Sequence, residues 1–228
     1  MLLPISHYSF YGRSCIGIYF RVTDRFVICP ESTMDEDVKL LLETFKVDTV
    51  VKTTVYKSDL LGIFTVANSR GILLSPLVGD DEFERIKASL PGDIRVDVLP
   101  TKWTAIGNFL LVNDLGCISG LRLSREQVRV ISDTLDIEVE TGSIENLPYT
   151  GSLAVATNRG VLVDPMILSE EEDLIRNLLK VPVYKGTVNY GSRLIKIGVV
   201  ANSYGLLVSD NTRGSELARV TEAFRIEE

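Results

Sequence analysis

The stretch ANSRGILLSP, residues 67–76, has the pattern of a β-strand end, a tight turn and a second β-strand. Two similar stretches follow it, VATNRGVLVDP at 155–165 and VANSYGLLVSD at 200–210. Asn at the start of such a turn hydrogen-bonds to its own backbone, and we expect the glycine to supply the positive φ that the end of the turn needs. Three β-hairpins of one design therefore indicate an internal repeat.

The turn glycines indicate the length of the repeat. Gly71, Gly116, Gly160 and Gly205 lie 45, 44 and 45 residues apart, and the second of them belongs to a fourth hairpin, LVNDLGCISGL at 111–121. A near-constant period of this length is typical of proteins built from one repeated supersecondary unit. The chain is therefore expected to contain several copies of that unit.

A fifth, degenerate copy of the hairpin precedes the others at 20–30, FRVTDRFVICP, where TDR replaces the turn from Asn to Gly. Apolar residues recur after every hairpin at the spacing of one helix face, which supports this assignment. In the fourth unit Glu172 takes the first apolar place, and we expect Leu174 to compensate. The predicted helix faces consist of Val38, Leu41 and Phe45; Phe83, Ile86 and Leu90; Val128, Ile131 and Leu135; Ile175 and Leu179; and Leu217, Val220 and Phe224.

Capping-box patterns predict where three of these helices begin, with T-x-x-E at 33–36, S-x-x-Q at 124–127 and S-x-x-E at 169–172. Alternating segments such as IRVDV, 94–98, and IEVE, 137–140, follow the helices and are predicted to be half-exposed strands. Each unit is therefore predicted to have the order β-β-α-β. Five helical patterns exclude a WD40 propeller, whose blades contain strands only.

The fifth unit is expected to lack a final strand, and the N-terminal residues offer one. Ile16-Gly17 matches the unit ends Leu61-Gly62, Ile106-Gly107 and Ile197-Gly198, so residues 1–16 have the pattern of a unit end. We therefore predict a single α+β domain, residues 1–228, in which five units of about 45 residues close into a pseudosymmetric ring. The predicted units are 17–61, 62–106, 107–150, 151–197, and 198–228 together with 1–16.

Charge and hydropathy exclude several classes of function. The net charge is −7 and no segment is strongly basic, which disfavours a DNA-binding protein and favours a basic protein partner. No apolar run approaches the roughly 18–20 residues that a membrane span needs. The first residues, MLLPISHYSFYG, lack the basic region of a signal peptide. We expect a cytoplasmic monomer that does not bind membranes.

Two acidic runs and one aromatic residue require an explanation. GDDEFE, 79–84, and EEED, 170–173, stand at predicted helix N-termini, where negative charge is favourable, so we expect no metal ion there. Trp103 either packs against a strand or belongs to a contact surface. No motif predicts a cofactor.

Glycine-containing segments lead into several of the predicted units. TAIGN at 104–108, PYTG at 148–151 and GTVNYGS at 186–192 stand at equivalent phases of the repeat. In a closed ring such loops gather on one face, and loops on a rigid scaffold often bind partners. Glycine that merely permits a turn would explain the same spacing.

A closed ring of five β-β-α-β units resembles the pentein fold, a type of α/β propeller. The resemblance implies the possibility of a guanidine-modifying enzyme, such as a deiminase or an amidinotransferase, with a cysteine nucleophile and a histidine. Cys15, Cys29 and Cys117 are scattered, no cysteine follows the last of these, and His7 is the only histidine. We therefore expect buried, inert cysteines and keep this enzyme only as the alternative.

The motifs NSRGILLSP, LPGDIRV, TAIGN, LVNDLG and VPVYKGTVNYGS, followed by GVVANS, resemble the archaeal and eukaryotic family of translation initiation factor six, the ribosome anti-association factors. The resemblance implies binding to the large (50S) ribosomal subunit, through a ribosomal protein and the sarcin–ricin loop region of the large-subunit RNA. It implies steric prevention of association with the small (30S) subunit, without catalysis. Initiation and large-subunit biogenesis both fit this role, and a biogenesis scaffold overlaps with it. By motif, the implied contact residues are Gly107, Asn108, Asn189, Tyr190, Gly191 and Ser192.

Overall fold

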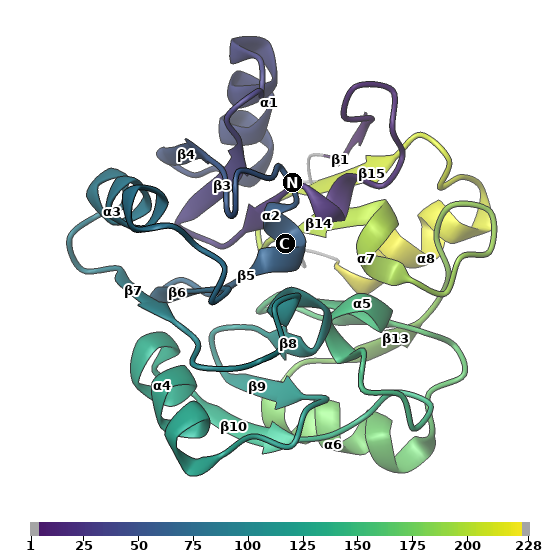
Figure 1. Cartoon of the computed structure of the whole chain (residues 1–228). Coiled ribbons are helices and arrows are strands. Elements are labelled where there is room, and N and C mark those ends of the chain that lie inside the picture. Colours follow the sequence, from purple (N-terminus) through teal and green to yellow (C-terminus); the bar gives the residue numbers. More distant parts are fainter. Residues whose placement is uncertain (1–4, 225–228) are drawn as a thin grey trace.

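Five three-stranded sheets surround a central axis in the computed structural model, which describes residues 5–224 (Figure 1). In each sheet two antiparallel strands form a hairpin, and a third strand pairs in parallel with the second strand of that hairpin. The long helices lie toward the rim of the ring (Figure 1). This arrangement confirms the predicted α+β ring of five β-β-α-β units. No helix of the described residues is long and apolar enough to cross a membrane.

Units are numbered from one to five in the order of their hairpins, and each begins with a short helix that the sequence did not predict. Unit one contains η1 (Ile16–Ile18), β2 (Arg21–Val22), β3 (Phe26–Pro30), α1 (Asp35–Phe45) and β4 (Thr49–Thr53). Unit two contains α2 (Leu61–Phe64), β5 (Thr65–Ala67), β6 (Gly71–Leu74), α3 (Asp80–Ser89) and β7 (Arg95–Val98). Unit three contains η2 (Ile106–Asn108), β8 (Leu110–Val112), β9 (Gly116–Ser119), α4 (Arg125–Leu135) and β10 (Glu138–Thr141). Unit four contains α5 (Thr150–Leu153), β11 (Ala154–Ala156), β12 (Val161–Val163), α6 (Ser169–Leu179) and β13 (Val183–Lys185).

The fifth unit is completed by the N-terminal strand. It contains α7 (Ile195–Gly198), β14 (Val199–Ala201), β15 (Leu206–Ser209) and α8 (Ser215–Ala223), and its third strand is β1 (Ile5–Tyr8). β1 pairs in parallel with β15, with Ile5 opposite Leu206 and Tyr8 opposite Ser209. The predicted closure of the ring is thereby confirmed.

The hydrophobic core lies between the units rather than within them. Side chains of β6 alternate in direction, so Ile72 packs with Phe26 of unit one while Leu73 packs with Ile131 of unit three. Each of the five clusters of buried residues combines two neighbouring units in this way. A unit alone would expose both of its apolar faces, which explains why the copies close on one another.

The predicted helix faces are largely correct. Leu41, Ile86, Ile131, Ile175 and Val220 are each almost completely buried, and the first apolar residue of each face lies at its edge. In the fourth unit, where Glu172 takes an apolar place, Leu174 packs against the core, as predicted.

Two of the three predicted helix starts are wrong. Ser124 and Gln127 form the expected reciprocal hydrogen bonds. By contrast, α1 follows Met34 and α6 follows Leu168, so Thr33 and Ser169 are not the N-caps. In α6 the acid of the capping box is therefore Glu171, whose carboxylate accepts a hydrogen bond from the backbone nitrogen of Leu168 at 3.1 Å.

The expected reason for the turn glycines is also wrong. None of the four has a positive φ, although Asn68 does accept the predicted hydrogen bond from the Gly71 nitrogen at 3.1 Å. A Cβ atom on Gly71 would lie 2.2 Å from the Thr134 carbonyl oxygen, at the end of the next unit's helix. Glycine is therefore required because the neighbouring unit passes too closely for a side chain.

The degenerate first hairpin and an insertion in unit two compensate for each other. Phe26 stands 45 residues before Gly71, in the place of a turn glycine. It faces α3, which ends early in an extended Leu90 followed by Pro91-Gly92. α1, α4 and α6 end instead in a left-handed residue. Phe26 packs with Leu90 and Ile94, so the aromatic ring fills the space that this shorter helix leaves.

Candidate functional site

Four tight loops between units gather at one end of the sheets. They close through the bridges between Phe10 and Arg13, Val55 and Ser58, Ile144 and Leu147, and Val188 and Ser192, and we call them the boundary loops. In unit four, β12 begins at the hairpin turn, and β13 runs parallel to β12. The loop that follows β13 therefore lies at the end of the sheet away from the hairpin turn. The boundary loops therefore share one face of the ring, the boundary face, as predicted for GTVNYGS.

Each of three boundary loops is held by a glutamate from the helix of the next unit. The Glu82 carboxylate accepts hydrogen bonds from Thr54 Oγ1 at 2.6 Å and from the backbone nitrogens of Tyr56 and Lys57 at 2.8 Å. Both of these backbone positions have a positive φ, so the carboxylate stabilises a conformation that side chains rarely adopt. Equivalent bonds join Glu171 to residues 143–146 and Glu216 to residues 187–191.

The two acidic runs are thus explained without a metal ion. Burial alone would raise the pKa of Glu82, but hydrogen bonds from the Gly79 backbone, the Thr54 hydroxyl and the Lys57 backbone together lower it below the ordinary value. Within residues 5–224 no three His, Cys, Asp or Glu side chains are grouped to bind a metal. The prediction that these runs favour helix N-termini is correct but incomplete, because one carboxylate in each run also fixes a loop.

Aromatic side chains stand out from the boundary loops. Tyr11, Tyr56 and Tyr190 occupy the tips of three loops and are 60%, 65% and 72% exposed. In the segment that leads from unit two into unit three, Trp103 is 44% exposed and its ring centroid lies 5.4 Å from that of Phe109. Trp103 therefore combines both predicted alternatives, because it is exposed at the surface and also packs against Phe109. Exposed aromatic residues on a rigid face are typical of protein-binding surfaces.

The segment 189–192, predicted to bind a partner, combines one anchoring residue with an exposed tip. Asn189 Nδ2 donates to the Ser14 carbonyl oxygen at 3.2 Å, and its Oδ1 accepts from Thr212 Oγ1 at 3.1 Å. Asn189 thereby ties the loop to the segment that leads into unit one. Tyr190 and Gly191 point to solvent with positive φ, and Ser192 is half-buried.

The second predicted segment lies in η2, at the centre of the ring. Asn108 is half-buried, whereas Gly107 is buried, and a Cβ atom there would lie 2.3 Å from the Gly62 carbonyl oxygen. Gly107 can therefore affect a partner only through the backbone. Asn108 lies at the start of unit three, whereas residues 189–192 form the loop that leads from unit four into unit five.

Gly107 is part of a ring of close contacts among the short helices. A Cβ atom on Gly62 would lie 2.1 Å from the Gly17 oxygen, and one on Gly17 would lie 1.8 Å from the Lys196 oxygen. The fifth unit therefore places Lys196 where the others have glycine. The predicted equivalence of Ile197-Gly198 is wrong by two residues, because position 196 lies 45 residues after Gly151.

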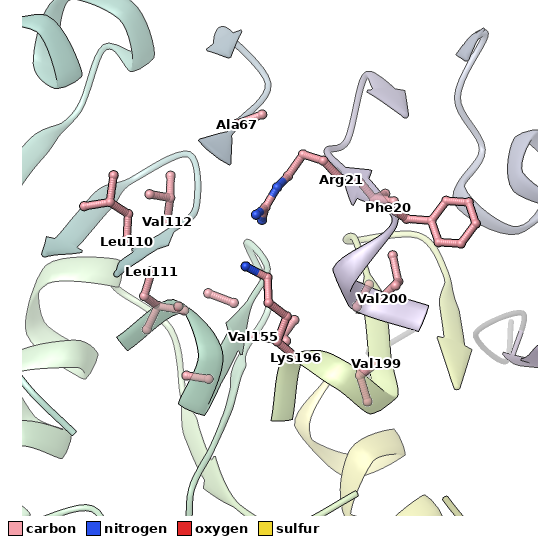
Figure 2. Close-up of a pocket in the computed structure, with 16 residues that line it drawn as sticks. Phe20, Arg21, Ala67, Leu110, Leu111, Val112, Val155, Lys196, Val199 and Val200 are labelled. Atoms are coloured by element: carbon pink, nitrogen blue, oxygen red, sulfur yellow. The ribbon is translucent and has the colours of Figure 1, made fainter. Parts of the chain in front are cut away.

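Sequence reasoning missed two basic residues that meet at the centre. Figure 2 shows Arg21 and Lys196 pointing toward each other into a cavity of about 60 Å³. By the repeat period, Arg21 stands where units two to five have Val66, Leu111, Val155 and Val200. Aligning all five units column by column would have shown both departures, since each places a charge among apolar or glycine residues.

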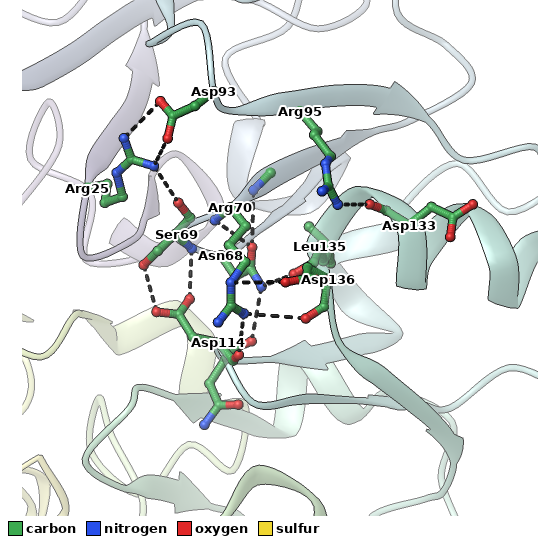
Figure 3. A network of polar contacts seen from close by, with 12 residues as sticks. Arg25, Asn68, Ser69, Arg70, Asp93, Arg95, Asp114, Asp133, Leu135 and Asp136 are labelled. Atoms are coloured by element: carbon green, nitrogen blue, oxygen red, sulfur yellow. Dashed lines mark hydrogen bonds and ion pairs between the residues drawn. The ribbon is translucent and has the colours of Figure 1, made fainter.

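The hairpin turns close the opposite face of the ring with polar contacts. Ser69 donates to Asp114 from its backbone nitrogen and from its hydroxyl, each at 2.7 Å (Figure 3). Asn158 Nδ2 donates to both Asp114 and Asp24, at 2.7 and 2.8 Å. Arg25 pairs with Asp93 at 2.7 Å and also reaches the Ser69 carbonyl oxygen (Figure 3). This face therefore ties units together.

The described residues do not favour the alternative cysteine enzyme. Burial raises the pKa of Cys29 to about 11 and that of Cys117 to about 12, whereas a nucleophilic cysteine needs a lowered pKa. Cys15 is half-buried. His7 lies in the closing strand β1, opposite Val208.

Comparisons with known proteins agree with the sequence resemblance. The profile of the eIF-6 family matches residues 5–223. Translation initiation factor 6 of Pyrococcus horikoshii is 36% identical over 224 residues, which cover 97% of this chain and 98% of that protein. The corresponding protein of Aeropyrum pernix is 38% identical over 217 residues, covering 94% of this chain and 92% of that protein. The solved N-terminal domain of ArgZ is 15% identical with a TM-score of 0.45, covering 83% of each chain. The chain belongs to the eIF-6 family.

Proposed function

We propose that this protein binds the large ribosomal subunit and thereby prevents association with the small subunit. The observation that carries the proposal is membership of the eIF-6 family across residues 5–223, together with relatives that carry the name translation initiation factor 6. The proposed mechanism is steric. A bound ring occupies the surface that the small subunit would contact, and no bond is made or broken.

The boundary face is the proposed contact surface. It includes Asn108 near the axis of the ring and residues 189–192 at a loop tip, with Gly107 supporting the backbone beside Asn108. Tyr190 supports this assignment, because tyrosine at an exposed loop tip supplies a large contact area with little conformational entropy to lose. Glu216 and Asn189 hold the loop in place before binding, which lowers the entropic cost of association.

Charge supports a partner surface that is largely protein. The chain has a net charge of −7, so contacts with RNA phosphates would have to come from a few local cations. Lys57 and Lys102 are exposed on the boundary face and could reach a nearby RNA loop. We propose a ribosomal protein as the principal contact and the sarcin–ricin loop region as the neighbouring one, with the protein acting as a cytoplasmic monomer.

The experiment is sucrose-gradient sedimentation of the protein with purified large and small ribosomal subunits of an archaeon. We expect co-sedimentation with the large subunit and a fall in the fraction of joined subunits. Failure of both would refute the proposed function. A protein that binds the large subunit without reducing joining would instead support a biogenesis scaffold.

Substitutions on the two faces of the ring test which face contacts the ribosomal subunit. Tyr190→Ala and Asn108→Ala should each weaken binding about tenfold or more, the effect of losing a central interface side chain worth about 1.4 kcal/mol or more. Tyr204→Ala is the matched control, because Tyr204 is an exposed tyrosine of a hairpin turn on the opposite face. If Tyr204→Ala weakens binding and Tyr190→Ala does not, the contact face is the one with the hairpin turns.

A further inference from the structure

The cavity at the centre of the ring lies between the short helices and the hairpin turns. It has a volume of about 60 Å³, enough for several water-sized particles, since one water needs roughly 10–15 Å³. Its walls are mostly the first strands of the sheets, lined by side chains such as Val22, Ala67, Leu111 and Val155. The cavity therefore has mostly apolar side chains in its walls, although the surface that it exposes is largely polar, and it has room for a small ligand.

Two cationic side chains, Arg21 and Lys196, point into this cavity. Arg21 Nη2 donates to the carbonyl oxygens of Gly62 and Thr65, both at 2.7 Å. Lys196 Nζ donates to the Gly107 carbonyl oxygen. Arg21 Nε is buried and finds no hydrogen-bond partner among residues 5–224. One buried donor of Arg21, beside the cavity, is consequently unsatisfied.

No carboxylate compensates these charges within the described lining of the cavity, which is otherwise apolar or glycine. The nearest acids along the axis, Asp24 and Asp114, line the adjoining space beneath the hairpin turns. They already accept hydrogen bonds from Ser203 and Ser69 and share Asn158. Two like charges that point into one small cavity repel each other and lose hydration on burial, so the arrangement is costly without a counter-ion.

Burial lowers the pKa values of both cationic groups. Burial lowers the pKa of Arg21 to about 10. Burial, and secondarily the charge of Arg21, lowers the pKa of Lys196 well below its ordinary value. An anion placed between the two groups would reverse both effects.

We propose that the central cavity binds one small inorganic anion, in the size range from chloride to phosphate, between Arg21 and Lys196. The two side chains come from different units and replace Val or Leu in one case and glycine in the other, yet they converge on one point. The anion serves as a buried counter-ion that joins units one and five beside the closing seam. This site is independent of ribosome binding.

The test is a thermal melt of the full chain in sodium chloride, phosphate or gluconate at constant ionic strength. Gluconate is too large for the cavity and is the reference. We expect a saturable rise of about 2–4 °C with chloride or phosphate, since a ligand that binds only the folded state raises its stability. Identical melting temperatures in all three salts would refute the proposal.

Variants distinguish this site from general salt effects. Lys196→Met keeps the length of the side chain and removes the charge, and Arg21→Val installs the residue that units two, four and five carry at this place. Each should abolish the saturable response. Lys46→Met, at an exposed helix end, should retain it. A response that survives Lys196→Met with its midpoint unchanged would place the anion elsewhere.

A direct observation completes the test. Crystals soaked in bromide should show an anomalous scattering peak in the cavity between the Arg21 guanidinium and Lys196 Nζ, and this peak should vanish in Lys196→Met. A peak only at the protein surface would overturn the assignment, even if the melting temperature responds to chloride.

Discussion

Asn202 of unit five donates a hydrogen bond of 2.9 Å to the carbonyl oxygen of Phe45, the last residue of α1 in unit one. Asn68 makes the same bond to Leu135 in the next unit, at 2.8 Å. The contact that joins consecutive units is thus reused to close the ring. A hairpin turn in this fold is therefore the joint between one copy and the next.

Replacing the joint asparagines should destabilise the fold. Asn202→Ala and Asn68→Ala each remove a buried amide and leave a buried helix-end carbonyl without this donor. We expect a loss of about 1–3 kcal/mol in the free energy of unfolding for each, measured by urea denaturation. Asn177→Ala, at an exposed position of α6, should change it by less than about 0.5 kcal/mol. Equal effects for all three variants would show that the joint bond contributes nothing specific.

The turn glycines offer a second test with an internal control. Gly71→Ala would place Cβ 2.2 Å from the Thr134 oxygen, so units two and three must separate, at a cost of about 1–3 kcal/mol. Gly92→Ala has no atom within 4 Å of the new Cβ and should be neutral or stabilising by about 0.4–1 kcal/mol. Chemical denaturation of both variants gives the comparison. Destabilisation by Gly92→Ala but not by Gly71→Ala would contradict the close-approach explanation.

Most of the ring could be predicted from spacing alone. The turn glycines predicted four units, and the helix faces, such as those that end in Phe45 and Leu135, supported the fifth. The matching unit ends predicted the strand that closes the ring. Each of these signals is a local pattern repeated along the chain. The reason for the glycines could not be predicted in this way. Thr134 approaches Gly71 across a unit boundary, and such distances depend on how two copies pack.

The candidate site shows the same limit more strongly. The exposed loop at Tyr190 was predicted from a motif, and the structure places it at a tip. Burial of Gly107 and the meeting of Arg21 with Lys196 depend on the three-dimensional closure of the ring. A misalignment of two residues at Gly198 was sufficient to conceal Lys196. Near the axis of a closed repeat, small errors in phase therefore obscure the residues that differ between copies.

Phe26 permits a test of compensation between two departures from the repeat. Phe26→Gly restores the residue that the other four hairpins carry, yet it removes a fully buried ring from the cluster of Leu90 and Ile94. We expect a loss of about 3–5 kcal/mol. Combining Phe26→Gly with deletion of Pro91-Gly92 should recover part of that loss, because the helix could then extend toward the turn. Full stability of Phe26→Gly alone would contradict the packing argument.

The bonds between Glu82 and the boundary loop predict a dependence of stability on pH. The pKa of Glu82 is lowered in the folded protein, so its carboxylate contributes stability above the unfolded value of about 4.3 and loses it as the pH falls through the folded value. The difference in melting temperature between the native protein and Glu82→Gln should therefore be largest near neutral pH and shrink below about pH 4. Glu84→Gln, at an exposed position of the same helix, should show little difference at any pH. A gap for Glu82→Gln that widens in acid would mean that the loop is held by the protonated acid, contrary to the three backbone hydrogen bonds it accepts.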